Sequence, residues 1–153
     1  MTQFKLLKIS TQAIAILIVA AIYVGCAKSN LEEPFQTISY QWKGLDYNNK
    51  VILINSNEEL EKYIDSVDAD RPVVDFSKHS LLLASGQANA NVIKMHTTLI
   101  KKLNNNYTLK VEITLGVYNT MDNWDIGIIT PNIPKKANIN LDVQVIKPSL
   151  DLF

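Results

Sequence analysis

Alternating hydrophobic and polar positions dominate the second half of the chain and predict a β-sheet. From Tyr107 to Leu115 every second residue is apolar and the residues between them are polar, and the same alternation returns from Asn138 to Ile146. A period of two is typical of strands that place one face on a core and the other in water. Between these segments, Trp124 to Ile129 is a shorter apolar run that we also expect to be a strand.

Four further strands are expected earlier in the chain. The uninterrupted apolar run from Ser80 to Ala84 indicates a central strand covered on both faces. Val92 to Ile100 lies just before the first alternating segment, and the polar, asparagine-rich connection Lys101 to Asn106 fits a hairpin. Nearer the N-terminus, Thr37 to Trp42 alternates in the manner of a strand, and Val51 to Ile54 is short and apolar.

One helix is predicted to begin at Ser56. The sequence Ser56-Asn57-Glu58-Glu59 fits a capping box, in which the serine and the glutamate satisfy free backbone amides of the first turn. The apolar residues that follow have the spacing i, i+3, i+4 and i+7 and form one stripe: Leu60, Tyr63, Ile64 and Val67. This stripe predicts a helix of about ten residues with one face on the sheet. Asp68 to Pro72 then ends it, because the residue before a proline avoids helical geometry.

Taken together, these elements predict an α+β fold that is mostly antiparallel β. We expect a sandwich or a partly open barrel of about six to seven strands, with one short helix packed against it. The β-rich domain is expected to span residues 35–148, and residues 149–153 to form a tail.

The N-terminal residues have the pattern of an export signal. Lys5 and Lys8 precede an uncharged run from Ala13 to Val24, and about a dozen apolar residues suit a secretory signal but are short for a membrane span of about 20. At the end of this run, Tyr23-Val24-Gly25-Cys26 resembles a bacterial lipobox. The resemblance implies that residues 1–25 are a removed signal peptide, that Cys26 carries the lipid, and that residues 26–34 are a tether. An uncleaved signal anchor and an ordinary cleaved signal remain as alternatives.

A lipidated cysteine would place the protein in the bacterial cell envelope. Several acyl chains on one residue hold a domain stably on a membrane, so the resemblance implies that the lipid bilayer is a partner through acylated Cys26. Ala27 and Lys28 do not supply the aspartate of an inner-membrane retention signal, which favours the outer membrane. Cys26 is the only cysteine of the chain, so no intramolecular disulfide can form.

The order of elements over residues 50–146 carries a second, looser resemblance. The predicted helix is followed by Val74-Asp75-Phe76-Ser77-Lys78, which leads into Leu81-Leu82-Leu83 and then into a series of strands. This order resembles small exported lipoproteins with a PrcB-like β domain, a domain associated with a protease complex. The resemblance implies a β-rich fold and assigns no functional residue.

Charge and motifs argue against several classes of function. The chain has 15 basic and 15 acidic residues and no basic stripe, so nothing favours nucleic acid as a partner. His79 and His96 lack the spacing of a metal or catalytic motif, and no nucleotide fingerprint is present. The acidic cluster Asp65, Asp68, Asp70 and Asp75 lacks the glycine and the glutamate of a calcium loop, and we interpret it as solvated. We therefore expect neither a metal nor a cofactor.

Met121 to Asp125 is the clearest candidate for contact with a partner. A tryptophan beside polar turn residues can anchor a binding partner, so Trp124, Tyr118 and Asp122 are the candidate contact residues. The competing interpretation, which we favour for Trp124, Trp42 and Tyr118, is that these aromatic rings pack on the sheet.

Two functions follow from these patterns. The first is a membrane-anchored lipoprotein with a non-enzymatic binding or accessory domain, which meets an envelope protein or a glycan through an edge strand or through the loops near 87–91 and 118–124. The alternative is an envelope hydrolase that uses His79 or His96 with a nearby carboxylate.

Overall fold

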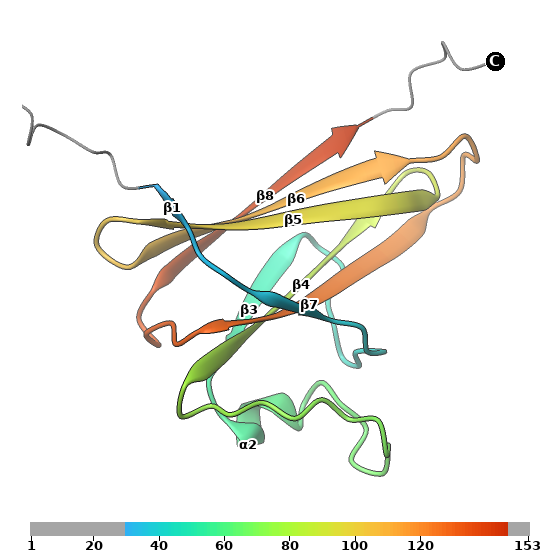
Figure 1. Cartoon of the computed structure of the whole chain (residues 1–153). Coiled ribbons are helices and arrows are strands. Elements are labelled where there is room, and N and C mark those ends of the chain that lie inside the picture. The colour runs from blue at the N-terminus through green and yellow to red at the C-terminus, as the bar shows by residue number, and fades with distance from the viewer. Residues whose placement is uncertain (1–29, 147–153) are drawn as a thin grey trace, which may run out of the picture.

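The computed structural model describes residues 30–146, and it shows two β-sheets packed face to face (Figure 1). The predicted signal peptide, Cys26 and the tail 149–153 lie outside the described residues. Sheet A contains, in spatial order, β1 (Leu31–Glu32), β5 (Val92–Lys102), β6 (Asn106–Leu115) and β8 (Asn138–Ile146). Sheet B contains β2 (Gln36–Ile38), β7 (Asp122–Pro131), β4 (His79–Ala88) and β3 (Lys50–Ile54). The predicted class is confirmed as a β-sandwich, and its described part contains one short helix, α2 (Asn57–Leu60).

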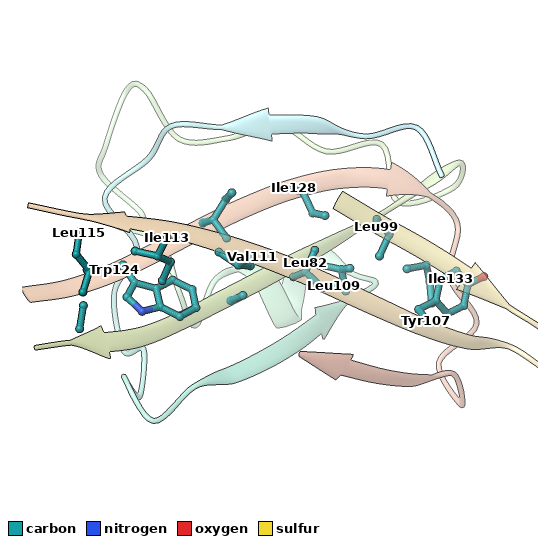
Figure 2. Close-up of a cluster of buried hydrophobic side chains, with 13 residues drawn as sticks. Leu82, Leu99, Tyr107, Leu109, Val111, Ile113, Leu115, Trp124, Ile128 and Ile133 are labelled. Atoms are coloured by element: carbon teal, nitrogen blue, oxygen red, sulfur yellow. The ribbon is translucent and has the colours of Figure 1, made fainter. Parts of the chain in front are cut away.

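The main core lies between the two sheets. Leu109, Val111 and Ile113 of β6 face Leu82 of β4 and Ile128 of β7, and all five side chains are buried (Figure 2). The alternation predicted for the strand that begins near Tyr107 is therefore confirmed. Its apolar positions form the core, as expected for a half-buried strand.

A second apolar cluster covers the outer face of sheet B. Leu81 and Leu83 of β4 point to this side, where they meet Leu60 and Ile64 from the segment that contains α2. Alternate residues of β4 thus enter different cores. The prediction of a central strand covered on both faces is confirmed, and β4 lies between β7 and β3.

One pair of strands departs from the antiparallel arrangement. β6 and β8 are parallel neighbours, with Asn106 opposite Asn138 at their first residues. The reason lies in the path of the chain. β7 runs back along sheet B to the end where β6 begins, so β8 returns to sheet A in the same direction as β6.

The helix is shorter than predicted. α2 covers only Asn57–Leu60, because the amide of Tyr63 donates to the carbonyl of Leu60, three residues back, at 2.9 Å. This tighter turn ends the α-helical pattern. Leu60 and Ile64 are buried as the apolar stripe predicts, whereas Val67 is 87% exposed, and for Val67 the prediction is wrong.

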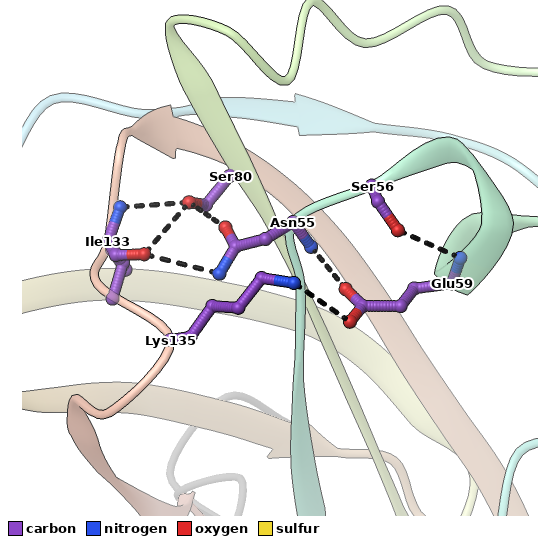
Figure 3. Close-up of polar contacts among 6 residues, drawn as sticks. All are labelled: Asn55, Ser56, Glu59, Ser80, Ile133 and Lys135. Atoms are coloured by element: carbon purple, nitrogen blue, oxygen red, sulfur yellow. Dashed lines mark hydrogen bonds and ion pairs between the residues drawn. The ribbon is translucent and has the colours of Figure 1, made fainter.

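The predicted capping box forms in modified form and joins three parts of the chain (Figure 3). The Ser56 hydroxyl accepts the amide of Glu59 at 3.2 Å, but the Glu59 carboxylate accepts the amide of Asn55 at 2.7 Å rather than that of Ser56. The Asn55 side chain in turn accepts from the hydroxyl of the buried Ser80, and that hydroxyl accepts the amide of Ile133 at 2.8 Å. The start of α2, strand β4 and the loop after β7 are therefore tied together.

The first predicted strand is mostly irregular. Instead of a strand from Thr37 to Trp42, β2 spans only Gln36–Ile38 and pairs with β7. The chain then folds over the sheet, where the buried ring of Trp42 lies against Gly127 and meets Tyr40 edge-on at 5.0 Å. Packing of Trp42 on the sheet, the interpretation favoured from the sequence, is confirmed.

The predicted tether 26–34 is partly wrong. Leu31–Glu32 forms β1 and pairs with Ile100–Lys101 at the end of β5. The amide of Glu33 also donates to the carbonyl of Leu99 at 2.9 Å. The folded domain therefore includes Leu31 and Glu32, ahead of the expected start at residue 35, and with β1 the described residues hold eight strands, more than the six to seven expected.

Candidate binding surface

Exposed apolar side chains gather at one end of sheet A. Val117, Tyr118 and Met121, in the loop between β6 and β7, are each 70% exposed. Ile93 near the start of β5 and the last two residues of β8 are also exposed, and the strand register brings them to the same end. We call this surface the distal tip; its residues are Ile93, Val117, Tyr118, Met121, Val145 and Ile146.

Asn91 holds the loop of the distal tip in place. Its backbone amide donates to the Tyr118 carbonyl at 3.2 Å, and its side-chain oxygen accepts the Tyr118 amide at 3.0 Å. The carbonyl of Asn91 accepts the amide of Gly116 at 2.7 Å, and the Asn91 side chain occupies the space that a Cβ at Gly116 would need. The Asp122 carboxylate closes the other end of the loop, since it accepts the amide of Val92 at 2.9 Å.

The three residues selected from the sequence have different roles. Trp124 is only 3% exposed and packs in the main core beneath Gly86, so its ring cannot contact a partner directly (Figure 2). The competing interpretation, packing on the sheet, is confirmed for Trp124. For Tyr118 that interpretation is wrong, because its ring stands in solvent. Asp122 is half-buried and supports the loop through Val92.

Within residues 30–146, no strand pairs with the outer edge of β5 near the distal tip, and we call this stretch the free edge of β5. The carbonyl of Leu99 points to the β1 side, where it accepts from Glu33. Because alternate residues of an antiparallel strand direct their backbone groups to the same side, the amide and carbonyl groups of Thr97 and Met95 point the same way. No β1 residue reaches them, since the chain leaves β5 at Pro34, which has no N–H to donate, and crosses to β7.

A groove of about 500 Å³ lies along this free edge. The segment around β2 forms one wall and β5 the other; the lining residues are Phe35, Thr37, Ile38, Ser39, Tyr40, Met95, His96, Thr97, Asp125 and Ile126. Among the described residues, the buried hydroxyl of Thr97 has no hydrogen-bond partner. Burial raises the pKa of the Asp125 carboxyl, and a hydrogen bond from Tyr47 opposes that rise. The residues that line the groove therefore include a threonine with a buried, unpaired hydroxyl and an aspartate with a partly desolvated carboxyl.

The sequence predicted an edge strand as a possible contact but did not identify β5. Its pattern resembles that of any half-buried strand. The sequence feature that points to this free edge is Pro34, because it stops the pairing of β1 with β5. After Pro34 the chain forms β2 and pairs with β7, a strand far along the sequence, so the local sequence does not show where the chain goes.

The two histidines lie on different sheets. His79 begins β4 opposite Pro131, and His96 lies on β5 opposite Glu112, whose carboxylate accepts from Lys110 at 2.8 Å. Within residues 30–146, neither imidazole pairs with a carboxylate.

The acidic residues that follow α2 serve local turns. Asp68 and Asp75 each accept the backbone amide two residues ahead, and Asp65 pairs with Lys43. In the described part of the chain, no three histidine, cysteine, aspartate or glutamate side chains come close enough to hold a metal ion.

Comparison with known proteins gives no relative from which to transfer a function. No family model matches the chain, and neither a curated protein nor a solved structure matches it. Over residues 30–146, none of the helices has the length and apolar character needed to cross a bilayer.

Proposed function

We propose that this protein is a lipoprotein held on an envelope membrane through acylated Cys26, and that its β-sandwich is a non-enzymatic binding module. Its contact surface is the distal tip together with the free edge of β5. The outer membrane is the favoured location, and the partner is another polypeptide of the envelope.

The observation that carries the binding role is an ordered loop with apolar side chains in water. The loop from 116 to 121 is fixed at both ends by Asn91 and Asp122, yet Val117, Tyr118 and Met121 remain mostly exposed. Clustered apolar side chains on a monomer commonly mark a site of protein interaction. A tyrosine fixed in this way contributes a large contact area with little further loss of conformational freedom.

The free edge of β5 favours a polypeptide rather than a glycan. Its outward amide and carbonyl groups at Met95 and Thr97 match the backbone of an extended segment, which can bind by adding a strand to the sheet. A bulge between Val92 and Lys94 and the charge of Lys94 limit the length of this edge, which protects it from open-ended aggregation. The Asp125 carboxyl in the groove would accept a donor from the added segment.

The anchor is tested by the intact mass of the protein extracted from membranes of an expressing diderm bacterium. We expect a chain that begins at Cys26 and is heavier by the mass of its lipid, and we expect a Cys26→Ala variant to lose both the lipid and the membrane attachment. A full-length chain of unmodified mass would contradict the lipoprotein assignment and return Cys26 to an incidental thiol.

The contact surface is tested by photo-crosslinking in the same cells. A photoreactive amino acid is placed at Tyr118 or at His96, and at Val67 as a control that is apolar and more exposed than Tyr118 but lies on the α2 side. We expect one defined protein adduct from Tyr118 and from His96, none from Val67, and loss of the Tyr118 adduct with Val117→Asp and Met121→Asp. Adducts of equal yield at all three positions, or none at Tyr118 and His96, would contradict the proposed surface.

A further inference from the structure

We infer that the end of the sandwich opposite the distal tip rests on the membrane, with Leu31 and Leu103 in contact with lipid, so that the distal tip points away from the bilayer. This inference rests on the proposed lipid anchor at Cys26 and adds an orientation to it. The membrane-facing end is formed by β1 and by the turn between β5 and β6 (Figure 1).

The short distance from the anchor to the domain limits where the bilayer can lie. Because β1 already pairs with β5, only residues 27–30 separate Cys26 from the folded domain. Five residue steps of extended chain span at most about 18 Å. β5 is 11 residues long, which corresponds to roughly 33 Å at the usual strand rise. The turn end of β5 is therefore held near the lipid, while the distal tip lies about one strand length away along the sheet.

Two leucines project from this end. Leu31 is 61% exposed and Leu103 is 70% exposed, and both line the same surface hollow of about 310 Å³. The turn that carries Leu103 is well defined, since Asn104 and Asn105 adopt the left-handed conformation at φ of 60° and 55°. The Asn106 side chain donates to the Leu103 carbonyl at 2.8 Å and closes the turn. Leu103 is thus presented to the solvent by a fixed turn.

Lys101 and Lys102 line the same hollow as the two leucines, together with Glu33, and the exposed Glu32 follows Leu31. Lys101 pairs with Glu33 at 3.2 Å, whereas Lys102 and Lys136 have no carboxylate partner among the described residues. Lys136 lies just before β8, which the bond from the Asn138 amide to the Asn105 carbonyl places beside the turn. Exposed lysines around apolar side chains are the composition that anionic headgroups attract. The end of the domain nearest the anchor therefore has the chemistry of a lipid-facing surface.

The test uses the full, lipidated chain in vesicles of phosphatidylethanolamine and phosphatidylglycerol. A single added cysteine, at Leu103 or at Met121, carries an environment-sensitive fluorophore, and nitroxide-labelled lipids act as quenchers. We expect a blue-shifted emission and at least twofold stronger quenching at position 103 than at position 121. With the fluorophore at Asn104, a Leu103→Asp substitution should reduce the quenching.

Each outcome separates the orientation from the anchor. A lipidated protein whose two labels are quenched equally, or whose label at 121 is quenched more, overturns the orientation and leaves the lipoprotein assignment standing. A protein of unmodified mass overturns the anchor and, with it, the inference. If a label at position 103 is shielded from solvent in cells but is not quenched by the labelled lipids in vesicles, lipid contact is overturned and a protein covers that end.

Discussion

Asn91 and Tyr118 hold each other through two reciprocal hydrogen bonds, one from each backbone amide, at 3.2 and 3.0 Å. Tyr118 belongs to the loop before β7 and Asn91 to the connection before β5, so this pair fixes the backbone that carries the exposed Tyr118 ring to sheet A. The exposed apolar side chains are consequently carried by a loop whose backbone is hydrogen-bonded to sheet A.

The first prediction concerns this pair. Asn91→Ala removes the acceptor of the Tyr118 amide, and we expect a loss of about 1 kcal/mol in the free energy of unfolding. Amide hydrogen exchange at Tyr118 should accelerate at least tenfold, and the Tyr118 crosslink should weaken. Asn123→Ala removes only an exposed bond to Gln87 and is the matched control. Unchanged exchange at Tyr118 would show that Asn91 does not order the loop.

Gly127 is predicted to be required by the ring of Trp42. A Cβ at position 127 would lie 2.5 Å from Cζ2 of Trp42, so Gly127→Ala should destabilise the protein by about 1–3 kcal/mol through overpacking. The measurement is urea unfolding followed by tryptophan fluorescence and circular dichroism. In a Trp42→Phe background the same substitution should cost clearly less, because that part of the ring is absent. Equal costs in both backgrounds would refute the steric explanation.

Ser80 is predicted to be the central member of the polar network in Figure 3. Its hydroxyl is fully buried, and it accepts the Ile133 amide at 2.8 Å. Ser80→Ala leaves that amide without a partner and should cost about 1–3 kcal/mol, measured by urea unfolding. Ser77→Ala, which removes an exposed hydroxyl bound to Asp75, is the control and should cost much less. A loss no larger than that of the control would argue that water replaces the Ser80 hydroxyl.

Asp125 is predicted to make stability fall as the pH rises. Burial raises the pKa of this carboxyl above its usual 3.8, so the folded state holds a proton that the unfolded state has released. The free energy of unfolding should therefore decrease as the pH rises from about 3.8 through the folded-state pKa. Above that pKa Asp125 is ionised in both states, and the free energy of unfolding no longer changes on its account. Asp125→Asn should remove this decrease and be more stable than the wild type at neutral pH.

Glu112 provides a control of opposite sign. The Lys110 ammonium lowers the pKa of the Glu112 carboxyl, so its contribution is present above the usual value of 4.5 and is lost as the pH falls. Glu112→Gln should therefore reduce stability at neutral pH and change little in acid. The measurement is thermal unfolding of the wild type, Asp125→Asn and Glu112→Gln between pH 3 and 7. If the two variants differ from the wild type in the same way across this range, the opposite pKa shifts assigned to the two carboxyls are contradicted.

The sequence by itself determined most of the strands and the alternation within them. The segments that begin near Tyr107 and Asn138 are strands as predicted, because a period of two leaves only one way to bury their apolar faces. The central position of Ser80 to Ala84 was also predictable, since an uninterrupted apolar run requires cover on both sides.

Only the tertiary structure decided which strands are neighbours and which surfaces remain uncovered. The helix stops at Leu60 although the apolar stripe continues: the Tyr63 amide closes a tighter turn on Leu60, and the Tyr63 carbonyl accepts the amide of the distant Lys43 at 2.8 Å. Leu31 joins β5 although its surroundings are polar, and Trp124 is buried although it stands beside turn residues. The free edge of β5 and the apolar distal tip arise from contacts between residues far apart in the chain, which a periodicity of hydrophobic positions does not encode.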